Sequence, residues 1–232
     1  MGTVILLRHA RSAANAAGIL AGRTPGVALD ESGHQQAETL VRRLAQLPLA
    51  AVVSSPLLRC RQTVAQLAQA RELEVSVDDR FMEVDYGEWT GRELRTLGKE
   101  PLWKVVQVHP SAAVFPGGEG LAALQARAVA AVREWDTKLA AEHGSQVIWL
   151  VCTHGDIIKA VLADALGMHL DSFQRIVVNP CSLSAVSYTQ TRPFVQRVND
   201  VGDDLRSLLP AKRRRRRPPS SDATPGGSTG TS

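Results

Sequence analysis

The segment VILLRHARS, residues 4–12, sets the starting point for interpreting the whole chain. Four aliphatic residues run without interruption into Arg8 and His9. A short apolar run that ends in polar residues is typical of a strand buried on both faces of a sheet. The polar pair then lies at the carboxyl end of that strand, where open parallel sheets bind their ligands. A strand-end histidine alone is more often structural than catalytic, so the rest of the chain must decide its role.

Strand-like and helix-like segments alternate along the chain. Further strands are predicted at residues 50–53, 75–77, 146–153, 176–178, 183–188 and 194–198. Helices are predicted from an Asp30 cap to before Pro48, and at residues 57–70, 119–143 and 157–166. This alternation favours an α/β fold, a three-layer α/β/α sandwich around a mostly parallel sheet of about six strands. Residues 79–120 carry many turn signals and are expected to form a lid or binding face.

The positive charge of the chain is concentrated at its C-terminal end. Six of the 27 Lys and Arg residues lie at positions 212–217, and Asp222 is the one acid after position 211, so residues 1–211 carry a net charge of −1. Beyond about residue 209 the composition turns to Arg, Pro, Ser, Gly and Thr, with little to bury. The sequence therefore predicts a catalytic domain over residues 1–208 and a disordered basic tail over residues 209–232.

Three widely spaced cysteines, Cys60, Cys152 and Cys181, form no C-x-x-C pair. This argues against a disulfide framework or a zinc site and favours a reducing, cytoplasmic location. The apolar run before Arg8 is too short for a signal peptide, and no run reaches the roughly 20 apolar residues of a membrane helix.

Two arginines and two histidines are expected at one rim of the sheet. His9 follows the first strand, His154 follows the strand at 146–153, and Arg59 lies in the first turn of the helix after the strand at 50–53. Arginine binds phosphate through two parallel hydrogen bonds, and a helix N-terminus adds backbone donors. Together with Arg8, this set predicts a site for a doubly charged oxyanion.

Blocks of sequence, in order from residue 3 to about residue 200, resemble one enzyme family. These are Leu7-Arg8-His9 with Asn15, Leu29-Asp30 with Gly33 and Gln36-Ala37, residues 54–63 with Arg59, Glu83 with residues 86–91, and Thr153-His154-Gly155. The chain resembles the histidine phosphatase superfamily, branch one, with a phosphoglycerate mutase-like fold. Ordered blocks make this a specific resemblance, which Arg8-His9 alone could not support.

The resemblance implies a metal-independent, cofactor-free histidine acid phosphatase. His9 would attack phosphorus to give a phosphohistidine, and Glu83 would protonate the leaving oxygen and then activate water. Arg8, Arg59 and His154 would neutralise the charge on the transferring phosphoryl group. The expected substrate-binding residues are Arg8, Arg11, Asn15, Arg59, His154 and Gly155.

Two departures from the family pattern follow His9. Ala10 replaces the signature glycine, so its methyl group is expected to alter the pocket if it approaches the phosphate. Arg11 offers a third arginine for the substrate, against the alternative of a solvated side chain. Trp89 in the acid block favours a phosphatase over a mutase, although it could equally pack in the core.

The sequence leaves the substrate and the binding partners open. The expected partner is a small phosphorylated metabolite; a phosphomutase is the first alternative, and nucleic-acid or anionic-surface binding through residues 212–217 is the second. A homodimer and weak nucleic-acid contact through the tail also stay open. Five residues of the irregular middle are candidates for the mouth of the site: Arg92, Trp103, Lys104, His109 and Phe115.

Overall fold

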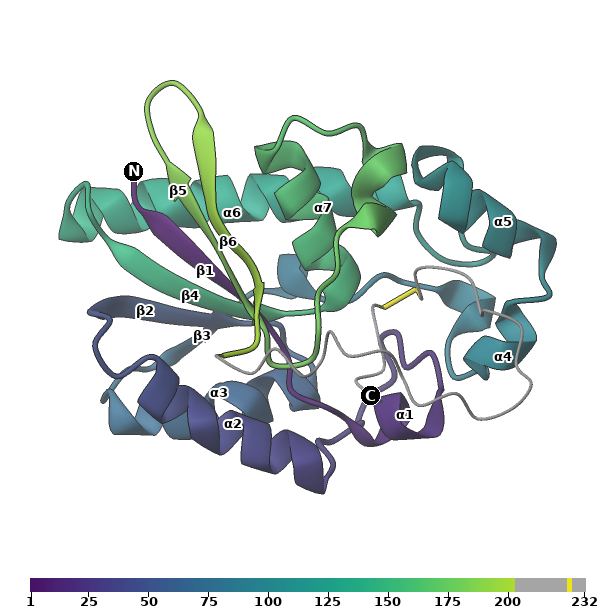
Figure 1. Ribbon diagram of the computed structural model, residues 1–232, viewed down its shortest axis with the longest axis horizontal. Helices are drawn as coiled ribbons and strands as arrows, with labels where there is room; N and C mark the ends of the chain where they lie inside the picture. The colour runs from purple at the N-terminus through teal and green to yellow at the C-terminus, as the bar shows by residue number, and fades with distance from the viewer. Residues whose placement is uncertain (203–224, 227–232) are drawn as a thin grey trace.

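The computed structural model describes residues 1–202 and 225–226 and has a six-stranded sheet at its centre (Figure 1). The strand order is β3-β2-β4-β1-β5-β6; the first four strands are parallel to one another, and β5 runs antiparallel to both of its neighbours, β1 and β6. The strands are β1 (Thr3–Arg8), β2 (Leu49–Ser54), β3 (Val75–Val77), β4 (Ile148–Thr153), β5 (Leu183–Tyr188) and β6 (Pro193–Asp200). The predicted α/β class with a mostly parallel sheet of about six strands is confirmed.

Helices cover both faces of the sheet. The helices are α1 (Ala13–Ala17), α2 (Glu31–Arg43), α3 (Leu58–Ala70), α4 (Leu94–Leu97), α5 (Pro101–Val108), α6 (Leu121–His143) and α7 (Gly155–Ala165). Figure 1 shows α2 and α3 on one face and α6 and α7 on the other. This is the expected three-layer arrangement, because a parallel sheet must bury both of its faces.

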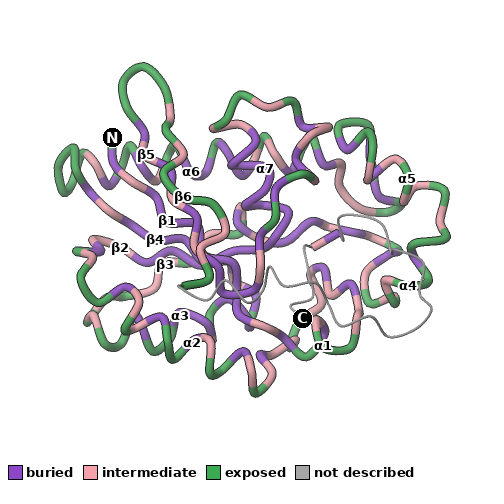
Figure 2. Tube along the Cα trace, in the orientation of Figure 1, coloured by how far each residue is buried: buried purple, intermediate pink, exposed green. Residues whose placement is uncertain are grey.

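The alternation of side chains along β1 separates two hydrophobic cores. Val4 and Leu6 point to the core shared with α6 and α7, whereas Ile5 and Leu7 point to the core shared with α2 and α3. Figure 2 shows the central strands as the most continuously buried part of the chain. Uninterrupted aliphatic sequence is what a strand with two apolar faces requires.

The start of α2 is fixed against the loop that follows His9. Asp30 caps the helix by accepting a hydrogen bond from the Gly33 N–H at 2.8 Å. A Cβ atom at Gly33 would overlap the carbonyl oxygen of Arg11, so only glycine fits at this approach. The cap and the glycine together hold the segment after His9 against the helix.

One sequence prediction about the fold was wrong, and a second was incomplete. Residues 176–178 are not a strand: they run in an extended path past the carboxyl end of the sheet, where the Val178 carbonyl accepts a hydrogen bond from Arg8. The middle of the chain is not merely a lid, because it contributes α5 and buried aromatic residues such as Phe81 and Phe115 to the core. Turn-rich sequence concealed these packed aromatic residues.

The expected boundary at residue 208 and nearly all of the expected tail fall outside the described residues. Pro225 and Gly226 are the exception, and they lie beside the site described below. Within residues 1–202 and 225–226, no helix is long and apolar enough to span a bilayer.

Candidate active site

The register of two parallel strands brings two histidines together. Arg8 of β1 is paired with Thr153 of β4, and the His9 N–H donates to the Thr153 carbonyl at 2.9 Å. The next residue on each strand is therefore a histidine at the same edge of the sheet. The ring centroids of His9 and His154 are 5.2 Å apart. Both side chains are buried, and both lie at strand ends on one rim of the sheet, as the sequence led us to expect.

Hydrogen bonding selects one nitrogen of His9 for chemistry. Nδ1 lies 2.8 Å from the carbonyl oxygen of Ala10, which can only accept, so Nδ1 carries the proton. Nε2 then keeps its lone pair and accepts from Arg59 Nε at 3.3 Å. Burial, and then the charges of Arg59 and Arg8, hold the pKa of His9 well below its ordinary value of 6.5. The unprotonated Nε2 is the nucleophile that phosphoryl transfer to histidine needs.

Arg59 joins the two histidines from the first turn of α3. Its Nη2 donates to the Gly22 carbonyl at 2.8 Å and lies 3.2 Å from His154 Nδ1. Its Nη1 is buried and makes no hydrogen bond with the described part of the chain. A buried guanidinium donor without a partner costs free energy unless a ligand completes it. Arg59 is therefore placed to bind an oxyanion beside His9 Nε2.

His154 and Arg8 complete the positive side of the site. Since Arg59 donates to Nδ1 of His154, Nε2 carries the ring proton and donates to Ser55 Oγ at 2.9 Å. Burial and then Arg59 lower the pKa of His154 well below 6.5, which keeps the ring neutral. The fully buried Arg8 is anchored by Nη1 to the Val178 carbonyl at 2.7 Å, and burial lowers its pKa to about 10.

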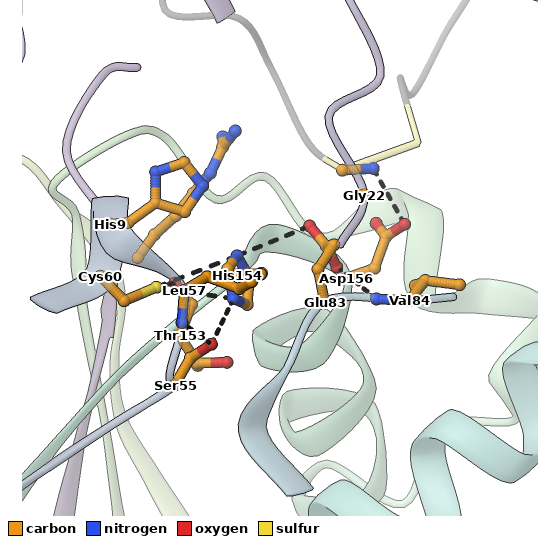
Figure 3. A network of polar contacts seen from close by, with 12 residues as sticks. His9, Gly22, Ser55, Leu57, Cys60, Glu83, Val84, Thr153, His154 and Asp156 are labelled. Atoms are coloured by element: carbon orange, nitrogen blue, oxygen red, sulfur yellow. Dashed lines mark hydrogen bonds and ion pairs between the residues drawn. The ribbon is translucent and has the colours of Figure 1, made fainter. Parts of the chain in front are cut away.

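Glu83 provides an acid on the opposite side of the site (Figure 3). Its Oε1 accepts from the Val84 N–H at 3.0 Å, and its Oε2 lies 3.9 Å from His154 Nδ1. Burial, and then the charge of Asp156, raise the pKa of Glu83 to about 7, against the opposing effect of Arg59 and Arg8. A carboxyl that holds its proton near neutrality is suited to protonate a leaving group.

The backbone of Glu83 is fixed by two arginines from other elements. Arg23 Nε and Arg127 Nη2 donate to the Glu83 carbonyl at 2.9 and 3.3 Å. Glu119 holds both arginines, at 3.0 Å from Arg23 and 2.6 Å from Arg127. This network orients the acid without touching the cavity.

The structure places the other expected binding residues in different ways. Asn15 lines the cavity, and its Oδ1 accepts from the N–H and hydroxyl of Ser12 at the start of α1. Gly155 begins α7 directly after His154. Arg11 does not line the cavity; its guanidinium pairs with Asp30 at 3.3 Å.

The remaining candidates around the mouth do not reach the cavity. Phe115 is buried against Tyr86 and Trp89, and Trp103 stacks on Trp89, so Trp89 is a core residue. Ala10 is also buried, within the core on the α2 and α3 side, and its N–H donates to Thr63 Oγ1 at 2.9 Å.

Three of the candidates in the middle of the chain lie elsewhere. The Arg92 guanidinium pairs with Glu100 at 2.5 Å, and the largely exposed His109 lies 3.7 Å from Asp171. Lys104 lies on α5 and is not among the residues that line the cavity.

The cavity beside His9 is enclosed and nearly filled. Its lining residues are His9, Ser12, Asn15, Ile19, Leu20, Ala21, Gly22, Arg59, Glu83, Leu94, Pro225 and Gly226. About 20 Å³ of free space remains, enough for little more than one water molecule. Pro225 and Gly226 therefore occupy room that a substrate would need.

Sequence reasoning missed one acidic residue of the site. Asp156 is buried at the start of α7, and the Tyr86 hydroxyl donates to its Oδ2 at 2.8 Å. A signal was present, because an acid stands between His154-Gly155 and an otherwise apolar helical run, three residues before Lys159. Among the described residues, no group of three or more His, Cys, Asp or Glu side chains is arranged to hold a metal ion.

An α/β sandwich that gathers two neutral histidines, two arginines and a protonated carboxyl at the ends of parallel strands defines a class of enzyme that handles phosphate esters. The sequence matches the family model for the histidine phosphatase superfamily (branch 1) over residues 4–201. The chain belongs to this superfamily, and it is accordingly a metal-independent phosphomonoester hydrolase. The expectation drawn from the ordered sequence blocks is confirmed.

Curated relatives and solved structures agree with this family. The chain is 30% identical over 202 residues to phosphoserine phosphatase 1 of Hydrogenobacter thermophilus. This alignment covers 86% of this chain and 92% of the relative. It is 30% identical over 213 residues to a probable phosphoglycerate mutase, GpmB, of Yersinia pestis, covering 90% and 96%. The structure of YhfR from Bacillus stearothermophilus superposes with a TM-score of 0.79 at 23% identity, covering 87% and 98%. This last similarity shows the shared fold.

Proposed function

We propose that the protein hydrolyses a small phosphomonoester through a phosphohistidine on His9. The observation that carries the proposal is the cavity that His9, Arg59 and Glu83 line together. In the first step, His9 Nε2 forms a bond to phosphorus, the bond from phosphorus to the ester oxygen breaks, and Glu83 gives its proton to the departing alcohol. In the second step, the Glu83 carboxylate takes a proton from water, which attacks phosphorus and releases inorganic phosphate from Nε2.

Arg8 and Arg59 are assigned to the equatorial oxygens of the transferring group, and His154 joins them when its Nδ1, which accepts from Arg59 in this structure, gains a proton. Arg59 supports this role in two ways. Its Nη1 makes no hydrogen bond with the described residues, and its Nε lies next to the attacking atom, His9 Nε2. Preorganised donors of this kind stabilise the charge that develops in the transition state. Asn15 and the start of α7 at Gly155 are assigned to supporting contacts with the phosphate. We assign no contact with phosphate to Arg11, because its guanidinium pairs with Asp30.

Covalent trapping tests the mechanism directly. Wild-type protein mixed with an excess of p-nitrophenyl phosphate and quenched in base should carry one phosphoryl group, which mass spectrometry places on His9. His9→Ala should lose this adduct and about four orders of magnitude or more of kcat/KM. His143→Ala, an exposed histidine at the far end of α6, is the matched control and should behave as wild type. Equal activity in the wild type and His9→Ala would overturn the proposal.

A phosphomutase is the alternative, and the probable phosphoglycerate mutase among the relatives favours keeping it in the test. A mutase protects its phosphoenzyme from water and returns the phosphoryl group to a second hydroxyl. A rapid burst of alcohol followed by steady release of inorganic phosphate, without any added acceptor, is the expected result for a phosphatase. A burst that stalls until 3-phosphoglycerate is added would assign the mutase reaction instead.

The identity of the substrate is narrowed by one relative. Phosphoserine phosphatase 1 of Hydrogenobacter thermophilus aligns with this chain over nearly the whole length of the relative. Phosphorylated amino acids and similarly small metabolites are therefore the first esters to assay. Phosphoproteins and polynucleotides are expected to be poor substrates.

A further inference from the structure

A second carboxylate lies beside the acid of the proposed mechanism. Asp156 is the second residue of α7, two positions after His154, and it is 1% exposed. Figure 3 shows the carboxyl groups of Asp156 and Glu83 close together, and the charge of Asp156 acts on Glu83. The proposed hydrolysis uses one of these two groups, which leaves Asp156 without an assigned role.

Two side chains lie beside the carboxyl group of Asp156. The Tyr86 hydroxyl donates to Oδ2 at 2.8 Å, and the Lys159 ammonium lies 3.6 Å from Oδ1. Burial and the two carboxylates raise the pKa of Tyr86, so this hydroxyl stays a donor. Oδ1 itself makes no hydrogen bond with the described residues. Asp156 therefore offers a buried anionic acceptor next to the catalytic cavity.

Gly226 shows that this acceptor can be reached from the cavity. Its N–H donates to Asp156 Oδ2 at 2.9 Å, while a Cβ atom on the same residue would lie 3.8 Å from Glu83 Oε2. The N and Cβ atoms of one residue are about 2.5 Å apart, as standard bond lengths require. A single small group in the cavity can therefore contact both carboxyl groups at once. An oxygen bonded to a carbon at the Cβ position would lie next to Glu83, while the nitrogen lies next to Asp156. Two carbon atoms would then separate this oxygen from the nitrogen.

Apart from Arg59, the described residues that line this wall carry no positive charge that would attract an anionic leaving group. Beyond the residues of the proposed mechanism it is formed largely by Ile19, Leu20, Ala21 and Leu94. Among the described lining residues, Arg59 is the one with a permanent positive charge, and the proposed mechanism commits it to phosphate. Nearby Arg23 is held by Asp85 and Glu119.

We infer that Asp156 is a specificity-determining residue that binds a hydrogen-bond donor, above all an ammonium group, on the carbon next to the esterified carbon of the leaving alcohol. The substrate class is then the phosphate esters of 1,2-amino alcohols. The inference rests on the proposed phosphatase function and adds to it a preference that the mechanism does not require. A charge-assisted hydrogen bond in a buried site is strong enough to produce it.

Three esters that share a carbon skeleton test the preference. O-phosphoethanolamine carries an ammonium group at the carbon next to the esterified one, 2-hydroxyethyl phosphate carries a hydroxyl there, and ethyl phosphate carries only hydrogen. The full-length wild type should show a kcat/KM about tenfold or more higher for the ammonium ester than for the third ester, with the hydroxyl ester between them. The same order is expected for their inhibition constants against hydrolysis of p-nitrophenyl phosphate.

Substitution at position 156 should abolish the order. Asp156→Asn keeps the shape and removes the charge, so the ratio between the ammonium and hydrogen esters should fall toward one. Ratios between substrates cancel any general change in Glu83, which a purely structural role of Asp156 would also cause. Asp164→Asn, on the same helix but paired with Arg133, is the matched control and should keep the wild-type ratio. Tyr86→Phe keeps the charge of Asp156 and should keep the preference.

Each remaining outcome contradicts the inference. Equal kcat/KM values for the three esters in the wild type, or an unchanged ratio in folded Asp156→Asn, would overturn the role of Asp156 and leave the phosphatase proposal standing. If the wild type binds none of the three esters more tightly than inorganic phosphate, the substrate class is wrong. Failure of the phosphatase proposal shows itself separately, as the absence of a phosphoryl group on His9.

Discussion

The proposed mechanism depends on keeping two residues in particular protonation states. In that mechanism His9 must be unprotonated to attack phosphorus, and Glu83 must be protonated to release the alcohol. Burial acts on both in the required direction, because it disfavours a charged imidazole and a charged carboxylate alike. The charges of Arg59 and Arg8 lower the pKa of His9 further, while the charge of Asp156 raises the pKa of Glu83. One small cavity therefore holds both forms at the same pH.

The pH dependence of kcat/KM should report these two groups. Activity needs neutral His9, so it should fall on the acid side with a midpoint below 6.5. Activity also needs protonated Glu83, so it should fall on the basic side with a midpoint near 7. The phosphate group of the substrate also titrates, with a second pKa ordinarily about 6. The pH profiles should therefore be measured for esters that differ in this pKa, because a limb that belongs to the enzyme keeps its midpoint when the ester is changed. An acid limb centred above 6.5 would contradict the assignment of His9.

Replacing Glu83 should affect leaving groups unequally. Glu83→Gln cannot supply a proton, so kcat for an alkyl phosphate should fall by about 10²- to 10⁴-fold. p-Nitrophenyl phosphate releases a stable phenolate that needs no proton, and its phosphorylation step should change much less. Burst kinetics measure that step alone. An equal loss for both substrates in the burst phase would argue against Glu83 as the proton donor.

At the scale of elements, the position of the site depends on how α2 and α3 hold the segment after His9. Asp30 and Gly33 fix the start of α2 against Arg11, and Thr63 of α3 accepts from the Ala10 N–H while its own hydroxyl donates to the Arg59 carbonyl. The two residues that break the family pattern are therefore structural. Ala10 packs in the core, and Arg11 pairs with the helix cap.

A methyl group at Gly33 should separate α2 from this segment. Gly33→Ala forces the Arg11 backbone to move, and overpacking of this kind costs about 1–3 kcal/mol. Thermal unfolding should show a lower Tm, and the displaced His9 segment should also reduce kcat. Gly98→Ala is the control, since its Cβ would meet only ordinary contacts at 3.6 Å or more and its backbone is right-handed. Equal Tm values for the two variants would disprove the close approach.

The wrong and the incomplete sequence predictions also belong to the scale of elements. Residues 176–178 have the composition of a strand, but they run alone across the end of the sheet, where the Val178 carbonyl serves Arg8 instead of a neighbouring strand. The turn-rich middle gave no helical period to detect, although Trp89 and Phe115 pack there as core residues. Composition records neither pairing partners nor the direction in which a loop residue points.

At the scale of the whole molecule, residues more than 200 positions apart line one cavity. Pro225 and Gly226 lie beside His9 and Glu83, and the space left is too small for a phosphate ester. A segment that fills a site for part of the time lowers the apparent affinity for substrate by the fraction of time it is bound.

Removal of residues 203–232 should therefore lower KM for small phosphate esters while leaving kcat unchanged. Steady-state kinetics of the full and shortened chains make the comparison. A synthetic peptide spanning residues 219–232 should inhibit the shortened enzyme competitively. An unchanged KM would show that the segment does not compete with substrate.

The same shortened chain tests the basic run at residues 212–217. Salt-dependent retention on RNA or anionic vesicles that is lost with the segment, while turnover is kept, would assign a separate binding function to that run.

The sequence by itself determined the α/β class, the order of most elements and the group formed by Arg8, His9, Arg59 and His154, whereas Glu83 was identified through the resemblance to the family. It could do so because aliphatic runs specify buried parallel strands, and residues that end such strands must meet at one edge of the sheet.

Only the tertiary structure decided that Arg11 pairs with Asp30, that Asp156 lies beside Glu83, and that Gly226 enters the cavity. These facts depend on contacts between distant segments, where burial and charge pairing choose among orientations that local sequence leaves equal.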